Sequence, residues 1–157
     1  MGIKNSKMKS LFSPEAHKEI LERIDNLSNS SERQWGKMEV GQMLNHCQYP
    51  LKISLKRYNP NNRPNIMLKL MGKFFKKSLY NDKPWRQNLP TAKGLKVTES
   101  KDFGKEKDKL IGLINDFHQE KDKKEWDPHP VFGSFTPEQW GQMQYKHLDH
   151  HLRQFGV

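Results

Sequence analysis

Residues 136–155 read TPEQWGQMQYKHLDHHLRQF, and this stretch decides the fold because it has the start and the periodicity of an amphipathic helix. Thr136 supplies an N-cap hydroxyl, Pro137 suits the first helical position, and Gln139 completes a capping box. We therefore expect a helix that begins near Pro137. At about 100° per residue, one broad arc of this helix, which we expect to be buried, carries Trp140, Met143, Gln144, Tyr145, His147, Leu148, His151, Leu152 and Phe155. The opposite side carries Gln142, Lys146, Asp149 and Arg153, with His150 at the boundary.

His147 and His151 lie one turn apart on the arc that we expect to face the core. This spacing allows two imidazole nitrogens to share one metal ion. His46, far upstream in a second amphipathic segment, is a third candidate. A single inward-facing histidine is more often a hydrogen-bonded core residue, but two buried rings on one face cannot satisfy all of each other's nitrogens. We therefore favour a metal site made of His46, His147 and His151.

The segment that carries His46 runs from about Met38 to Tyr58, with apolar residues at helical intervals. Pro50 lies four residues after His46, where it removes a backbone donor and should bend the helix. Cys47 is the only cysteine, and as the direct neighbour of His46 it points about 100° away around the helix. We interpret it as a small buried thiol without a chemical role.

Three stretches carry a resemblance to a known superfamily: KMEVGQMLNHC at 37–47, HPVFG at 129–133, and Trp140 followed by KHLDHHLRQFG at 146–156. Together they resemble a bacterial branch of the DinB-like (DinB/YfiT-type) superfamily. That resemblance implies an all-α four-helix bundle with a long crossover between the second and third helices. It also implies a divalent metal on His46, His147 and His151. Characterised members include thiol S-transferases and a maleylpyruvate isomerase that use low-molecular-weight thiols, so the implied chemistry is metal-dependent thiol transfer or a related hydrolase or isomerase reaction.

The remaining helices follow from capping signals and periodicity. Ser13-Pro14-Glu15 should start a first helix, and Phe103 to Phe117 should form the third helix of the bundle. An accessory helix is expected after Pro64, to about Leu79, with four lysines on one face and apolar residues around the other. Residues 81–98 and 126–135 read as irregular segments, and no run alternates like a strand. We expect one domain over residues 1–157.

Composition and charge limit the classes of protein to which the chain can belong. The chain has 157 residues, one cysteine and a net charge of +10. No apolar run is long enough for a membrane span, and no secretory leader is evident, so a cytoplasmic location is the expectation. The positive charge is mostly lysine, without a docking motif for DNA or RNA, so no specific nucleic acid is expected and a solvated surface is preferred. The accessory helix could instead lie on a membrane or form a homodimer, although packing over the crossover explains its apolar side equally well.

Three neutral imidazoles would leave a coordination position open on a divalent ion, either zinc or nickel, with iron and manganese as alternatives. His150 and His129 are candidates for proton transfer at the rim, and Trp140 and Gln144 for the pocket wall or the support of the ligands. The substrate would be a small molecule, with a low-molecular-weight thiol as co-substrate. Two alternatives stay open: a metal-binding stress or sensory bundle without catalysis, and a basic module that binds an acidic partner.

Overall fold

The computed structural model describes residues 7–58, 65–91 and 95–157. Within these ranges the chain is helical and forms no strand, although one isolated bridge joins His129 and Gly133. Two short 3-10 helices are also present, η1 (Lys76–Leu79) and η3 (Glu120–Asp122). The α-helices are α1 (Pro14–Asp25), α2 (Val40–His46), α3 (Gln48–Ser54), α4 (Ile66–Phe75), α5 (Phe103–Gln119) and α6 (Pro137–Gln154). The expected all-α class is confirmed for the part of the chain that is described.

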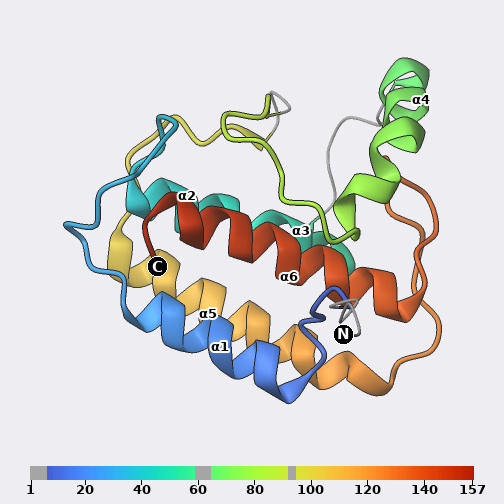
Figure 1. Cartoon of the computed structure of the whole chain (residues 1–157), viewed down its shortest axis with the longest axis horizontal. Helices are drawn as coiled ribbons and strands as arrows, with labels where there is room; N and C mark the ends of the chain where they lie inside the picture. The colour runs from blue at the N-terminus through green and yellow to red at the C-terminus, as the bar shows by residue number, and fades with distance from the viewer. Residues whose placement is uncertain (1–6, 59–64, 92–94) are drawn as a thin grey trace, which may run out of the picture.

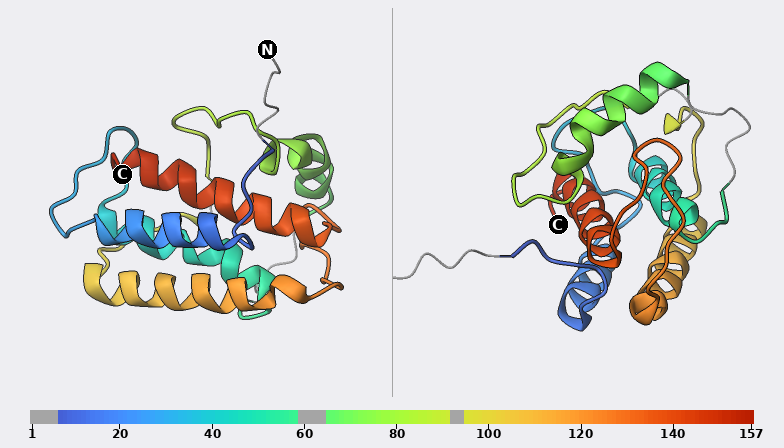
Figure 2. Two further views of the ribbon diagram at one scale, coloured as in Figure 1. Left: turned by 60° about the horizontal axis from the view of Figure 1, so that its bottom comes forward. Right: turned by 90° about the vertical axis from the view of Figure 1, so that its right-hand side faces the viewer.

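Four helical segments lie side by side: α1, the pair α2–α3, α5 and α6 (Figures 1 and 2). α2 and α3 pack on α5, while α1 packs on α6. Their apolar faces meet in one core whose largest fully buried side chains are Leu11, Ile20, Ile24, Met43, Leu44, Leu51, Leu110, Ile114, Phe117, Trp140, Leu148 and Leu152. α4 stands apart at one end of the molecule (Figure 1). None of the helices among the described residues is long and apolar enough to cross a membrane.

The expected helix starts are confirmed. α1 begins at Pro14 behind an N-cap, with Ser13 Oγ accepting a hydrogen bond from the Ala16 amide. α6 begins at Pro137 with the full capping box, because Thr136 and Gln139 each accept from the other's backbone N–H. These bonds satisfy amides that have no partner within the first helical turn.

The segment expected to be a single bent helix is divided into α2 and α3 at Cys47. Pro50 explains the position of the break, because it has no N–H to donate to the carbonyl of His46, four residues earlier. His46 is therefore the last residue of α2. Asn45 and Gln48, on either side of the break, both donate to the buried carboxylate of Glu106 on α5, at 2.8 and 2.6 Å.

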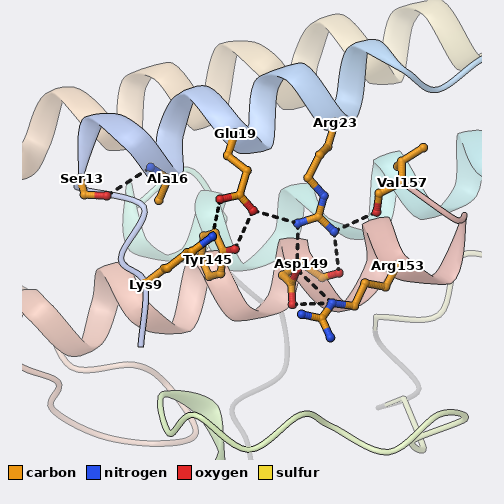
Figure 3. Close-up of polar contacts among 9 residues, drawn as sticks. All are labelled: Lys9, Ser13, Ala16, Glu19, Arg23, Tyr145, Asp149, Arg153 and Val157. Atoms are coloured by element: carbon orange, nitrogen blue, oxygen red, sulfur yellow. Dashed lines mark hydrogen bonds and ion pairs between the residues drawn. The ribbon is translucent and has the colours of Figure 1, made fainter. Parts of the chain in front are cut away.

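A polar network joins α1 to α6 (Figure 3). Arg23 Nη1 donates to Asp149 Oδ1 at 2.8 Å, and its Nη2 donates to the Val157 carbonyl at 2.9 Å. Glu19 accepts from Tyr145 Oη at 2.8 Å and from Lys9 Nζ at 2.6 Å. Asp149, which the helical periodicity assigns to the solvent side, is thus an interhelical contact.

Lys146 was also expected on the solvent side, and this prediction is wrong because the segment after α4 covers it. The Lys146 ammonium is buried and donates to the carbonyls of Ser78 and Asn81 at 2.6 and 3.0 Å and to Asn81 Oδ1 at 2.7 Å. Burial lowers the pKa of Lys146 to about 8. The crossover after α4 is therefore tied to α6 one residue before His147.

Candidate metal centre

His46, His147 and His151 come together between α2 and α6. One ring nitrogen from each lies within 4.8 Å of the other two, and His46 Nε2 is 3.2 Å from His147 Nε2. His46 reaches the cluster because the helix break places it at the end of α2, and the other two project from one face of α6. The site thus unites the three residues that the sequence singles out.

A backbone carbonyl orients the His46 ring. Its Nδ1 lies 3.2 Å from the carbonyl oxygen of Leu95, in the crossover. A carbonyl oxygen can only accept, so this contact places the proton of neutral His46 on Nδ1. The lone pair is then on Nε2, the nitrogen that faces His147.

Gln154 orients His151 in the same way. Its amide nitrogen donates to the carbonyl of Trp35 at 2.9 Å, which turns the amide oxygen toward His151 Nδ1, also at 2.9 Å. His151 therefore carries its proton on Nδ1 and its lone pair on Nε2. Gly36 makes room for this arrangement, since a Cβ there would lie 2.5 Å from Gln154 Nε2, and its φ of +81° suits glycine.

The three rings are neutral near pH 7. Burial, together with the neighbouring histidines, holds the pKa of His147 well below its usual value. Burial also lowers the pKa of His46, and it lowers that of His151 to about 3. Neutral imidazole is the form that binds a metal, so no proton has to be removed from the rings first.

The donor set fits a divalent ion that prefers nitrogen. Zinc binds imidazole nitrogen at about 2.0–2.1 Å, so two ligands at tetrahedral angles lie about 3.3 Å apart. The 3.2 Å between the Nε2 atoms of His46 and His147 matches this spacing. His147 Nδ1 is buried without a hydrogen-bond partner among the described residues, so hydrogen bonding alone does not satisfy the ring.

The model of the family described as "Protein of unknown function (DUF1569)" matches residues 5–156. The chain belongs to the DUF1569 family. No curated protein gives a significant match, and no solved structure does.

In this DUF1569 chain a hollow of about 500 Å³ is lined by residues that include Trp35, Trp85, Lys146 and His150, while none of the three cluster histidines is part of its lining. The Trp85 ring packs 5.5 Å from the His150 ring and 6.1 Å from the His147 ring, measured between centroids. His150 is half-buried, as its boundary position predicts, and burial lowers its pKa. A larger hollow of about 690 Å³, between residues 29–33, 39–41 and 100–101, has no histidine among the described residues that line it.

The other candidates lie away from the ligand atoms. His129 packs against Trp140, at the opposite end of α6 from the cluster, and its Nδ1 accepts from the amides of Val131 and Phe132 at 3.0 and 3.3 Å. Trp140 packs in the aromatic core, with the Phe135 ring centroid 5.0 Å from its own. Gln144 is buried and donates to the Pro50 carbonyl at 3.0 Å, so it holds α6 against α3.

Cys47 is buried, and its thiol lies 3.7 Å from the sulfur of Met43. Burial raises the pKa of this thiol, which keeps it protonated at neutral pH. The interpretation of Cys47 as a small buried thiol is confirmed.

Sequence reasoning missed four groups around the cluster: Gln154, the Leu95 carbonyl, Trp85 and Trp35. A signal existed for Gln154 alone, since it follows His151 by three residues and so lies on the same face of α6. The other three lie in irregular segments, where periodicity gives no information on contacts.

Proposed function

We propose that the protein binds one divalent metal ion through His46, His147 and His151 and uses it in a thiol-dependent reaction of the DinB-like type. The observation that carries the proposal is the fixed direction of two lone pairs. The Leu95 carbonyl and the Gln154 amide leave Nε2 of His46 and of His151 free to coordinate. The motifs that resemble the DinB-like superfamily support the same three ligands and the four-helix-bundle description.

A divalent ion held by these three imidazoles would keep an open position and would lower the pKa of a thiol or water bound there. Zinc and nickel suit these ligands best, with iron and manganese as alternatives. The chain itself supplies orientation: Gln154 and Leu95 hold two rings, and Trp85 packs over His147 and His150.

His150 is our candidate for the residue that carries a proton beside the site. Its ring centroid is 5.1 Å from that of His151, and it lines the hollow between Trp35 and Trp85. A half-buried neutral imidazole can accept a proton from a thiol or water and return it to a leaving group. His129 precedes α6 and packs against Trp140 near the start of that helix, at the other end from the cluster, so we do not assign it this role.

Elemental analysis of the untagged protein, after removal of weakly bound ions, tests the metal. We expect about one equivalent of metal in the wild type. The control variant His17→Ala should hold the same amount, because the His17 ring lies outside the cluster and hydrogen-bonds Asn115 at 2.8 Å. His46→Ala and His147→Ala should lose the metal while keeping the helical circular dichroism spectrum. A wild type that neither retains metal nor takes up zinc, nickel or manganese would refute the site.

The reaction is tested separately, with the metal-loaded protein. Free thiol should disappear from glutathione or cysteine when an electrophilic substrate is added, and His147→Ala should lose this activity. His150→Gln should bind metal normally but react more slowly. If a metal-loaded wild type consumes no thiol over such a substrate screen, it is a metal-binding protein of another function.

A further inference from the structure

The accessory helix α4 exposes an apolar face that the described part of the chain does not cover. Phe74, Ile66 and Met67 are 86%, 78% and 71% exposed. Leu68, Leu70, Met71 and Phe75 are exposed as well. The sequence leaves open whether this face packs over the crossover, and these exposures show that it does not. A large contiguous group of exposed apolar side chains often marks an interaction site.

The direction of this face follows from how α4 is attached. Gly72 is the only buried residue of α4, and a Cβ there would lie 2.9 Å from Val131 Cγ1 and 3.2 Å from Phe132. At about 100° per residue, Met67 and Phe74 lie on the opposite side of the helix from Gly72. The apolar face therefore points away from the body of the protein, at the end where α4 projects in Figures 1 and 2.

The charges beside this face all have one sign. Residues 65–81, which span α4 and η1, contain four lysines and no acidic residue. Lys69 and Lys73 are exposed and flank the apolar arc, and Lys77 is exposed in η1. Lys76 is tied to the Ser134 carbonyl and lies 4.8 Å from the centroid of the Phe135 ring. The helix is thus apolar on its outer side and basic along its edge.

We propose that α4 and η1 form an interfacial segment that docks on the surface of an anionic lipid bilayer, with the apolar face among the acyl chains and the lysines at the headgroups. A helix with apolar side chains on one side and lysines beside them is suited to this position. The charge also decides against a second copy of the chain, because two such faces would bring eight lysines together without a carboxylate from residues 65–81. The net charge of +10 repels a second copy and attracts an anionic surface.

Co-sedimentation of the full-length protein with vesicles tests this docking. We expect binding to vesicles of phosphatidylcholine and phosphatidylglycerol, weak binding to phosphatidylcholine alone, and loss of binding at high salt. The double variant Met67→Ser/Phe74→Ser should bind at least about tenfold more weakly. Leu89→Ser, which changes an exposed leucine outside α4, should bind like the wild type.

A charge-matched pair tests the lysines. Lys69→Gln/Lys73→Gln should weaken binding by about tenfold or more. Lys121→Gln/Lys124→Gln removes the same charge from exposed positions outside α4 and should change it much less. Equal loss in the two variants, or no vesicle binding by the wild type, would overturn the proposal. So would a wild-type dimer in sedimentation velocity that Met67→Ser/Phe74→Ser dissociates, since that result assigns the face to a second copy.

Discussion

At the scale of single residues, Gln154 determines which nitrogen of His151 can coordinate a metal. We expect Gln154→Leu to weaken zinc binding about 10- to 100-fold, because the ring loses the acceptor that holds its proton on Nδ1. Gln154→Glu keeps an acceptor at the same place and should retain most of the affinity. Competition with a chromogenic chelator measures both affinities.

Gln142→Leu is the matched control for this change, because it replaces the same residue type toward the other end of α6. It should bind zinc like the wild type. Equal affinity of Gln154→Leu and the wild type would show that the amide does not support the site.

His129 should contribute to the pH dependence of stability. Burial lowers its pKa to about 4 in the folded protein. Between pH ~6.5 and ~4 the unfolded chain takes up a proton at this residue that the native chain does not. Stability is therefore complete above this range and falls by about 1.4 kcal/mol per pH unit within it. His129→Asn keeps an acceptor for the amides of Val131 and Phe132. In urea unfolding of the metal-free protein, its free energy of unfolding should decline less steeply with falling pH than that of the wild type. Parallel curves of this free energy against pH would contradict the assignment.

Residue types and spacing were sufficient to find His46, His147 and His151, because their inward direction follows from helical periodicity. The environment of Lys146 could not be found in this way. Periodicity assigns a residue to a side of the helix, but it does not show that residues 78–81 return to cover that side. The same limit applies to the Leu95 carbonyl, whose contact with His46 depends on the path of an irregular segment.

At the scale of helices, two glycines should respond to alanine with opposite signs. A Cβ added at Gly112 of α5 would meet none of the described atoms within 4 Å, whereas one at Gly41 of α2 would lie 2.4 Å from the Lys101 carbonyl oxygen. Gly112→Ala should raise the free energy of unfolding by about 0.5–1 kcal/mol, through helix propensity. Gly41→Ala should lower it by about 1–3 kcal/mol, because backbone must move. Urea denaturation checks both, and a stabilised Gly41→Ala would refute the close approach.

Arg23, whose side chain is 17% exposed, pairs with Asp149 across the contact between α1 and α6. Arg23→Met should lower the free energy of unfolding by about 1–3 kcal/mol, because Asp149 and the Val157 carbonyl lose a donor. Lys18→Met removes an exposed pair with Glu22, in which Lys18 is 77% exposed, and should change stability by less than about 0.5 kcal/mol. Similar effects of the two changes in thermal unfolding would show that the network in Figure 3 adds nothing beyond surface charge.

Helix starts were predictable because caps are local, and Pro14 and Pro137 mark them in the sequence. The division between α2 and α3 was only half predictable. Pro50 predicts a bend in the helix. The position of the break at Cys47 depends on the helical hydrogen bond that the His46 carbonyl lacks, and on the hydrogen bonds that Glu106 accepts from Asn45 and Gln48 on either side of the break.

At the scale of the whole molecule, the helical class follows from periodicity, while the position of α4 does not. Its apolar residues resemble those of a core helix, and the sequence does not say whether a partner surface exists within the chain. The attachment through Gly72 to Val131 and Phe132 joins segments far apart in the sequence. Only the folded chain shows that the apolar side faces outward.

The contact between His46 and His147 joins positions 101 residues apart. Closing so long a loop costs chain entropy, so the histidine cluster can form only after tertiary packing has brought the end of α2 beside α6. Isolated halves of the chain would each hold an incomplete ligand set. An ion bound by the cluster would crosslink the early and late parts of the sequence, and it would bind only when both parts have folded together. The single cysteine allows no internal disulfide that could form such a crosslink.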